Sequence, residues 1–270
     1  LAEQYLVRWL PEMPRTLPAL AADPASLAGD VSDVHNRLAI ARLGTWRHDA
    51  EALAAQGRNT VLPVRTDVSI LEEIEALAEK AIAEFGAVDL LFNNAGVASG
   101  GPIWESTEKD WKWLFGVNVD GVANGVRSFT PRMLAAAAAD AAYQGCIVNT
   151  ASMAGLVTAP GMGIYSVSKH AVLALSECLY HDLDLVGPQV RAAVLCPFYV
   201  TTNISQCYRN RPADLVNDSG PTRSQLATQA ISANDLASGT LTPEEVAAIT
   251  FNAIEEDRFY IYPSPEQLPI

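Results

Sequence analysis

Two patterns of apolar and polar positions occur along residues 47–270, one typical of strands and one typical of helices. Their order predicts strands that alternate with helices. Short stretches that read as strands lie at 60–68, 88–96, 145–152, 189–198 and 258–263. The stretch 88–96 is a continuous apolar run into a turn, which is typical of a strand buried on both faces. Apolar residues three and four apart are typical of helices, and they lie at 69–86, 106–142, 161–183 and 242–254. This order predicts an α/β fold, a doubly wound parallel sheet with helices on both faces.

Local signals predict where two of these helices begin and end. Ser69 is expected to cap the first helix and Gly86 to end it. Thr242, followed three residues later by Glu245, has the pattern of a capping box at the start of the last helix.

One long segment shows neither the strand pattern nor the helix pattern. Residues 203–240 are polar, and we expect a mobile segment that covers a binding site rather than a packed element. A chain of 270 residues without a visible repeat suits a single domain, 1–270, in which residues 1–46 are atypical.

The composition of the chain excludes several classes of binding partner. A net charge of −13 and a pI near 4.7 argue against nucleic acid and anionic membranes. No apolar run approaches the length that spans a bilayer, and the first residues lack the features of a secretory signal. The four cysteines and four histidines lack metal-ligand spacing, so we expect no metal, free thiols and a cytoplasmic location.

Chemistry-bearing residues follow three neighbouring strands. They are "NNAG" at 93–96, "TAS" at 150–152 and "PFYVTT" at 197–202. Such residues also form ordinary turns, but the carboxyl ends of parallel strands meet at one edge, where ligands bind. Tyr165 and Lys169 lie one helical turn apart, and a nearby ammonium lowers the pKa of a phenol. With Ser152 holding a substrate oxygen, Tyr165 can exchange a proton with an alcohol or a carbonyl group.

From about residue 50 onward, these motifs in this order resemble the short-chain dehydrogenase/reductase family. The matching residues are Asp67, "NNAG", Asn118 in "VNVDG", Ser152 thirteen positions before Tyr165, Lys169, and Pro197, Val200 and Thr202. The resemblance implies a Rossmann-like fold and a dinucleotide, NAD or NADP, that carries out hydride transfer. Phe198 departs from the glycine that often follows the proline in this family.

The resemblance also implies a role for each residue. Tyr165 is expected to be the acid/base, Ser152 to polarise the carbonyl, and Lys169 to tune Tyr165 and bind the nicotinamide ribose. Asn118 is expected to hold a relay water, although a helix-bending amide is the alternative. The expected cofactor-binding residues are Asp67 and Val68 at the adenine, Asn94, Ala95 and Gly96 beneath the cofactor, and Pro197, Val200 and Thr202 at the nicotinamide.

The first 46 residues depart from the family. A strand and a Thr-Gly-x-x-x-Gly-x-Gly turn are expected near residues 15–30, but "RTLPALAADPASLAGD" has one glycine and two prolines. This first strand-turn-helix unit is therefore doubtful, as is the choice between NAD and NADP. The cause is either genuine divergence or a reading-frame disturbance, since a shifted frame through residues 18–26 can encode a glycine-rich turn. Either way, we expect weak dinucleotide binding.

Three functions remain open at this point. The leading one is an NAD(P)-dependent oxidoreductase that interconverts an alcohol and a ketone. The others are a non-redox epimerase or dehydratase of the same family, and a cofactor-poor relic that acts as a binding or scaffold protein. We expect a homodimer or homotetramer, assembled through helices 106–142 and 162–186. The apolar residues expected in the substrate pocket are Met153, Leu156, Met162, Phe198 and Tyr199.

Overall fold

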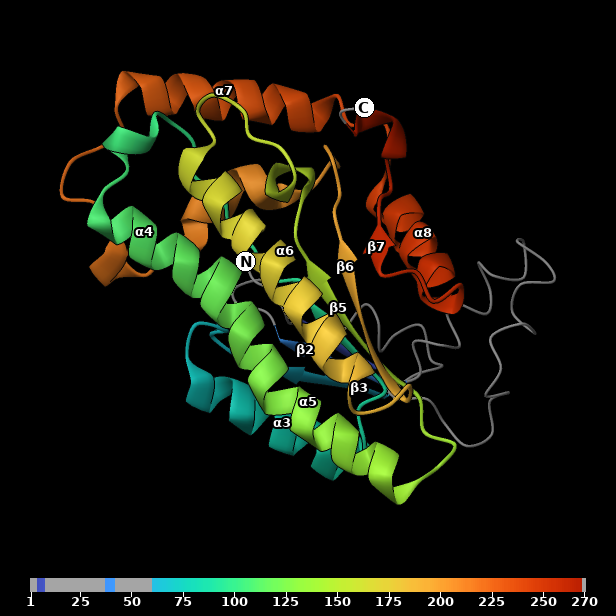
Figure 1. Cartoon of the computed structure of the whole chain (residues 1–270). Helices are drawn as coiled ribbons and strands as arrows, with labels where there is room; N and C mark the ends of the chain where they lie inside the picture. The colour runs from blue at the N-terminus through green and yellow to red at the C-terminus, as the bar shows by residue number, and fades with distance from the viewer. Residues whose placement is uncertain (1–3, 8–36, 42–59, 269–270) are drawn as a thin grey trace.

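A seven-stranded sheet forms the centre of the protein (Figure 1). The computed structural model describes residues 4–7, 37–41 and 60–268. The strands lie in the order β3-β2-β1-β4-β5-β6-β7. Their bounds are β1 Gln4–Val7, β2 Arg37–Ala41, β3 Thr60–Val64, β4 Leu90–Asn93, β5 Gly145–Thr150, β6 Val190–Leu195 and β7 Tyr260–Ile261.

The sheet is parallel except for β1. Strands β4 to β7 pair in parallel, as do β2 and β3, so the Rossmann-like prediction is confirmed for the part of the chain that carried it. β1 pairs antiparallel with both neighbours, with Gln4 opposite Asn93 and Val7 opposite Leu90. The carboxyl end of β1 therefore lies at the edge where β4 begins, away from the edge where β4 ends.

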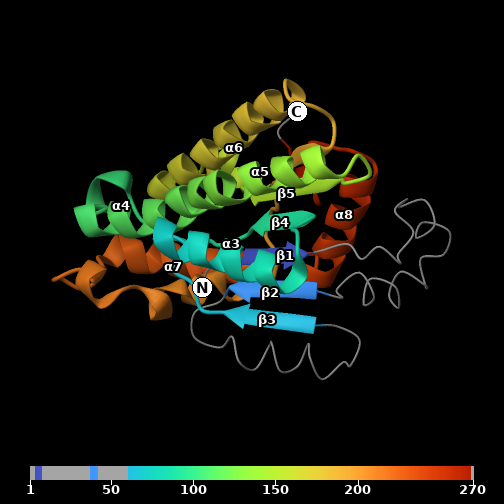
Figure 2. The same ribbon diagram turned by 90° about the horizontal axis from the view of Figure 1, so that it is seen from below.

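Helices cover both faces of the sheet (Figures 1 and 2). The α-helices are α3 Leu71–Phe85, α4 Glu108–Phe115, α5 Gly121–Ala139, α6 Gly163–Asp184, α7 Arg223–Ala237 and α8 Pro243–Glu255. The main core cluster joins α3, α5 and α6 to one face, for example through Leu77, Phe129 and Ile147. A second cluster joins α8 to the other face through Val148 and Ile254.

The predicted helix ends are partly correct. Gly86 ends α3 with φ 84°, a left-handed conformation that glycine adopts without a steric penalty. Thr242 and Glu245 form the expected capping box of α8. The prediction for Ser69 is wrong, because α3 begins after Ile70 without a side-chain cap. The Ser69 hydroxyl instead donates to Asp67 Oδ1 at 2.6 Å.

The predicted helix 106–142 is interrupted. A π-helical turn, Gly116–Asp120, joins α4 to α5. Single π-turns inside helices are frequent at functional sites, and Asn118 lies in this one. Hydrophobic periodicity alone does not reveal such a turn, because the flanking helices keep their apolar faces.

The segment 203–240 is more regular than predicted. It contains two 3-10 helices, η5 Asn203–Asn210 and η6 Ala213–Leu215, followed by α7. α7 begins with a capping box between Thr222 and Gln225. Sequence reasoning did not predict α7, because most of its side chains are exposed and it therefore carries no clear apolar period.

The structure also bears on disulfides, metal sites and membrane spans. All four cysteines are free. Within the described residues no group of three His, Cys, Asp or Glu side chains could hold a metal ion. In the same part of the chain, every helix falls short of the length and apolarity that a membrane crossing requires.

Candidate active site

The three predicted strand ends meet at one edge of the sheet. The ends of β4 and β5 are joined by Asn93 Nδ2, which donates to Asn149 Oδ1 at 2.8 Å. One residue further on, Thr150 Oγ1 donates to Asn94 Oδ1 at 2.8 Å. These bonds fix the two loops that leave the sheet, so the expectation that they lie together is confirmed.

Ser152 is placed by the short 3-10 helix η4, Met153–Gly155, which follows β5. Its hydroxyl accepts from the Ala154 N–H at 3.1 Å, and the Met153 N–H donates to the Pro197 carbonyl at 2.9 Å. η4 packs directly against α6, because a Cβ on Gly155 would lie only 2.6 Å from the Lys169 carbonyl oxygen. This close approach brings Ser152 beside Tyr165.

Tyr165 and Lys169 both lie on the inner face of α6. Tyr165 is 9% and Lys169 3% exposed, so the pair is not a surface pair. Lys169 Nζ lies 5.8 Å from the centre of the Tyr165 ring and donates to the Thr150 carbonyl at 2.8 Å. The proximity predicted from the four-residue spacing is confirmed.

Burial sets the ionisation of both groups. Burial raises the pKa of Tyr165 to about 12, although a hydrogen bond with Ser152 lowers it in part. Burial lowers the pKa of Lys169 to about 8. At neutral pH the phenol is therefore protonated, and most of the lysine carries its charge.

Lys169 was expected to lower the pKa of Tyr165, and the structure corrects this expectation. The phenol's pKa is raised rather than lowered, because burial removes the water that would solvate a phenolate. The ammonium faces the ring and the Thr150 carbonyl. Tyr165 is thus a proton donor at rest, and it acts as a base only once it has lost its proton.

Asn118 is fully buried behind these residues. Its Oδ1 accepts from the Val97 N–H at 2.8 Å, and its Nδ2 donates to the Val97 carbonyl at 3.0 Å. Nδ2 also lies 3.0 Å from Ser168 Oγ. The side chain thus ties the π-turn to the loop after β4, which agrees with the helix-bending alternative; the relay water stays a prediction.

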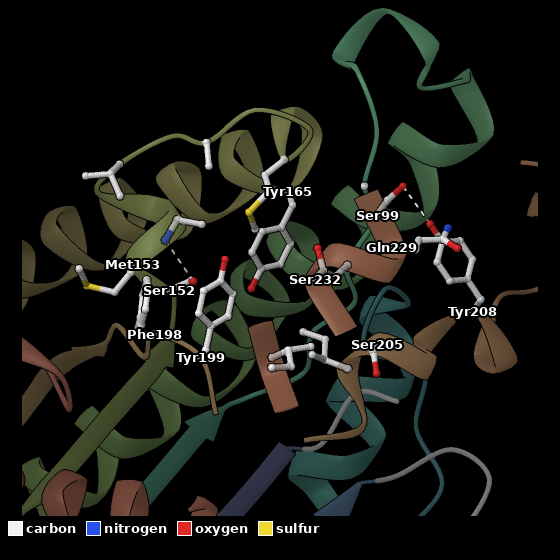
Figure 3. A pocket seen from close by; sticks show the side chains of 18 residues that line it. Ser99, Ser152, Met153, Tyr165, Phe198, Tyr199, Ser205, Tyr208, Gln229 and Ser232 are labelled. Carbon is white, nitrogen blue, oxygen red and sulfur yellow. Dashed lines mark hydrogen bonds between the residues drawn. The ribbon is translucent and has the colours of Figure 1, made fainter. Parts of the chain in front are cut away.

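Ser152 and Tyr165 line a cavity of about 170 Å³ (Figure 3). Its walls include four of the five predicted apolar residues: Met153, Met162, Phe198 and Tyr199. Leu156 was predicted to line it as well, but it packs instead in the cluster around Val172, on the α6 side of η4.

Gly96, in the loop after β4, lies next to Lys169 and Asn118. A Cβ added to Gly96 would meet Lys169 Nζ at 3.7 Å and Asn118 Oδ1 at 3.8 Å, which are ordinary contacts. Gly96 thus contacts Lys169, which the family resemblance assigns to the nicotinamide ribose, and Asn118, which it assigns to a relay water. The Lys169 ammonium is the group in this part of the site that could hold the ribose of a dinucleotide.

The remaining predicted cofactor residues are spread along the same edge. Asp67 lines a second cavity of about 70 Å³ at the end of β3, and Thr202 is exposed at the start of η5. Three others, Val68, Ala95 and Val200, have buried side chains, so only their backbones can reach a ligand. The glycine-rich turn expected near residues 15–30 lies outside the described residues.

Sequence reasoning missed the polar residues at the far end of the cavity. These are Ser99, after β4, Tyr208 in η5 and Gln229 in α7, and two further serines, Ser205 and Ser232, also line the cavity. The segment 203–240 was predicted to cover the site, but its lack of periodicity gave no way to tell which side chains point inward.

Comparisons with known proteins agree with this arrangement. The short chain dehydrogenase family profile matches residues 37–213. A CLA biosynthesis dehydrogenase/reductase from Lactiplantibacillus plantarum is 33% identical over 78% of this chain and 72% of its own. A 1-deoxy-11-beta-hydroxypentalenate dehydrogenase from Streptomyces avermitilis is 33% identical over 78% of this chain and 68% of its own.

A solved structure matches a larger part of the chain than these relatives do. A short-chain dehydrogenase/reductase from Burkholderia phymatum, in complex with NAD, is 46% identical with a TM-score of 0.83, over 90% of this chain and 85% of that one. The profile covers more than half of the chain, and the motifs that it spans are those that build the site. The chain therefore belongs to the short-chain dehydrogenase/reductase family and is an oxidoreductase acting on CH–OH groups.

Proposed function

We propose that this protein interconverts a secondary alcohol and a ketone with NAD, and that Tyr165 supplies or takes up the proton. The observation that carries the proposal is the convergence of two hydroxyls, from Ser152 and Tyr165, on one cavity with Lys169 buried behind them. The Burkholderia phymatum relative, solved with NAD, supports NAD over NADP.

The proposed reduction needs one hydride and one proton. The dinucleotide, when bound, supplies the hydride to the carbonyl carbon. Ser152 donates a hydrogen bond to the carbonyl oxygen and holds it beside the Tyr165 hydroxyl. Tyr165 then gives its proton to that oxygen, which yields the alcohol and leaves a phenolate. The positive charge of Lys169, 5.8 Å from the ring centre, stabilises this phenolate. Oxidation is the reverse of these steps.

The remaining predicted residues have supporting places in this scheme. Gly96, with Asn94 and Ala95, would pass beneath the cofactor, and Asp67 with the backbone of Val68 would border its adenine. Pro197, Val200 and Thr202 would flank the nicotinamide, and Asn118 would hold the π-turn against the loop after β4. We propose that the segment 203–240 covers the substrate, since η5 and α7 both line the cavity.

Assembly and location are also proposals. Apolar side chains along and just after α6 are exposed, with Leu185 at 84% and Val186 at 63%. A homodimer or homotetramer that covers α6 would bury them. The free cysteines fit a reducing compartment such as the cytoplasm.

The two directions of the reaction are expected to respond differently to pH. Oxidation needs the phenolate, and the pKa of Tyr165 is raised to about 12. Its kcat/KM should therefore rise about tenfold per pH unit between roughly pH 6 and 8. Reduction uses the protonated phenol and should stay flat over the same range. Above about pH 8 the oxidation slope should fall, because Lys169 loses its charge.

Initial rates in both directions, measured across overlapping buffers, test this expectation. An oxidation rate that stays flat from pH 6 to 8 would show that the proton acceptor titrates below pH 6. Tyr165, in the environment described here, would then not be that acceptor.

A further inference from the structure

Polar side chains line the cavity in front of Tyr165 in two groups, on either side of Tyr165 (Figure 3). Ser152 and the Tyr165 hydroxyl form the reacting end. Ser99, Tyr208 and Gln229 gather on the other side of Tyr165, away from Ser152 and Met153. These three residues play no part in the proton transfer proposed above.

The three far-end residues form a connected polar group. The Tyr208 hydroxyl donates to Ser99 Oγ at 3.2 Å, and a side-chain hydrogen bond links Tyr208 to Gln229. A serine hydroxyl, a tyrosine hydroxyl and an amide together offer four donors and several acceptor positions. The two bonds within the group use only part of this capacity, so the group can bind a further polar atom.

Tyr208 is held firmly from behind. Its ring packs against Trp113 with 5.3 Å between ring centres, and the Arg211 guanidinium covers the Trp113 ring at 4.9 Å. Arg211 in turn forms a buried 2.7 Å ion pair with Asp110 of α4. The next residue before Tyr208 is anchored too, because Cys207 Sγ donates to the Ala98 carbonyl at 3.2 Å. The phenol is thus a fixed part of the wall.

Charge is missing from the walls. None of the 18 described residues that line the cavity has a charged side chain. The nearby carboxylate of Asp235 is hydrogen-bonded to Tyr199, one of the lining residues. A charged substrate would lose its hydration here without gaining a partner of opposite charge, and an anion would also be repelled by Asp235.

The size of the cavity suits a small ring. The cavity measures about 170 Å³. A cavity of roughly 150 Å³ is enough to hold a benzene molecule. One six-membered ring with small substituents therefore fits between the two ends, with Met153, Met162 and Ile204 among the apolar side chains around it.

We propose that the substrate is an uncharged alcohol or ketone about one ring in size, with a second neutral oxygen bound by Tyr208, Ser99 and Gln229. This proposal rests on the proposed function and adds the substrate class to it. The distal oxygen, rather than the apolar body, selects among ketones of similar size. Tyr208 is a specificity residue in this account.

Three ketone probes that differ only at the far end test the proposal. 4′-(Hydroxymethyl)acetophenone carries the distal hydroxyl, 4′-ethylacetophenone is its apolar isostere, and 4-acetylbenzoate is anionic. We expect the protein to prefer the hydroxymethyl probe to the ethyl probe by about tenfold, in Kd by NMR titration and in kcat/KM with NADH. The benzoate should bind more weakly than either.

Tyr208→Phe keeps the ring on Trp113 and removes only the hydroxyl. In this variant the hydroxymethyl preference should fall to about one, while binding of the ethyl probe stays unchanged. Tyr180 is a half-exposed tyrosine on α6. Its variant Tyr180→Phe is the matched control and should keep the preference for the hydroxymethyl probe.

The two claims fail in different ways. An equal Kd for the two neutral probes, or tighter binding of the benzoate, overturns the substrate class whatever the turnover. If the binding preference is present but no ketone oxidises NADH, the substrate class stands as a binding property, and the oxidoreductase proposal is the one that fails.

Discussion

Tyr165→Phe is expected to lower kcat/KM for ketone reduction by about 10²–10⁴-fold, the usual contribution of a positioned general acid. The variant loses the hydroxyl that is placed to protonate the carbonyl oxygen beside Ser152. It keeps the aromatic ring, which packs with Val97, Trp113 and Ile164 in one cluster. We therefore expect an unchanged fold and nearly unchanged ketone binding.

Circular dichroism, thermal unfolding and a ketone titration of the variant separate loss of chemistry from loss of structure. Tyr180→Phe on the same helix is the matched control and should keep full activity. Undiminished turnover by the Tyr165→Phe protein would show that the proton comes from another group.

The second large effect concerns the dinucleotide. We expect the chain, with residues 1–46 as printed, to bind NADH with a Kd well above micromolar. The family's glycine-rich turn provides several backbone hydrogen bonds and a helix N-terminus, each worth on the order of 1 kcal/mol or more. The orientation of β1 supports this expectation, because Val7 pairs with Leu90 and the strand ends at the wrong edge.

A graft tests whether the N-terminal segment is the cause. Replacing residues 1–36 by a strand, a Thr-Gly-x-x-x-Gly-x-Gly turn and a helix, with β2 kept, should tighten NADH binding by about 100-fold or more. The same graft with its glycines changed to alanine is the control and should not. Micromolar affinity in the original chain would contradict the account and mean that other residues have rebuilt the phosphate site. Resequencing the gene distinguishes divergence from a shifted reading frame.

Sequence patterns predicted the fold well wherever a strand or helix is buried along most of its length. β4, β5 and β6 are continuous apolar runs because both of their faces are covered. α7 escaped prediction for the opposite reason, since most of its side chains face solvent. The direction of β1 was also out of reach, because apolar patterning does not encode whether a strand runs parallel or antiparallel to its neighbours.

The site shows a similar division. Tyr165, Lys169 and Ser152 could be placed together, since a helical spacing and two strand ends fix their positions. The pKa values of these residues could not be predicted from the sequence. The raised pKa of Tyr165 depends on how completely the packed structure removes water from the phenol. Tyr208 and Gln229 reach the cavity from segments far from β4, and only tertiary packing brings them to Ser99.

The central claim is that hydride passes between a nicotinamide and the carbinol carbon of the substrate. The most direct measurement uses millimolar NADH deuterated at the transferable position, with 4′-(hydroxymethyl)acetophenone and the full chain. The account predicts one deuterium on the carbinol carbon of the product for each NADH oxidised, by mass spectrometry and NMR. Deuterium that stays on the dinucleotide while the substrate is epimerised or dehydrated, or no conversion at any dinucleotide concentration, would contradict it.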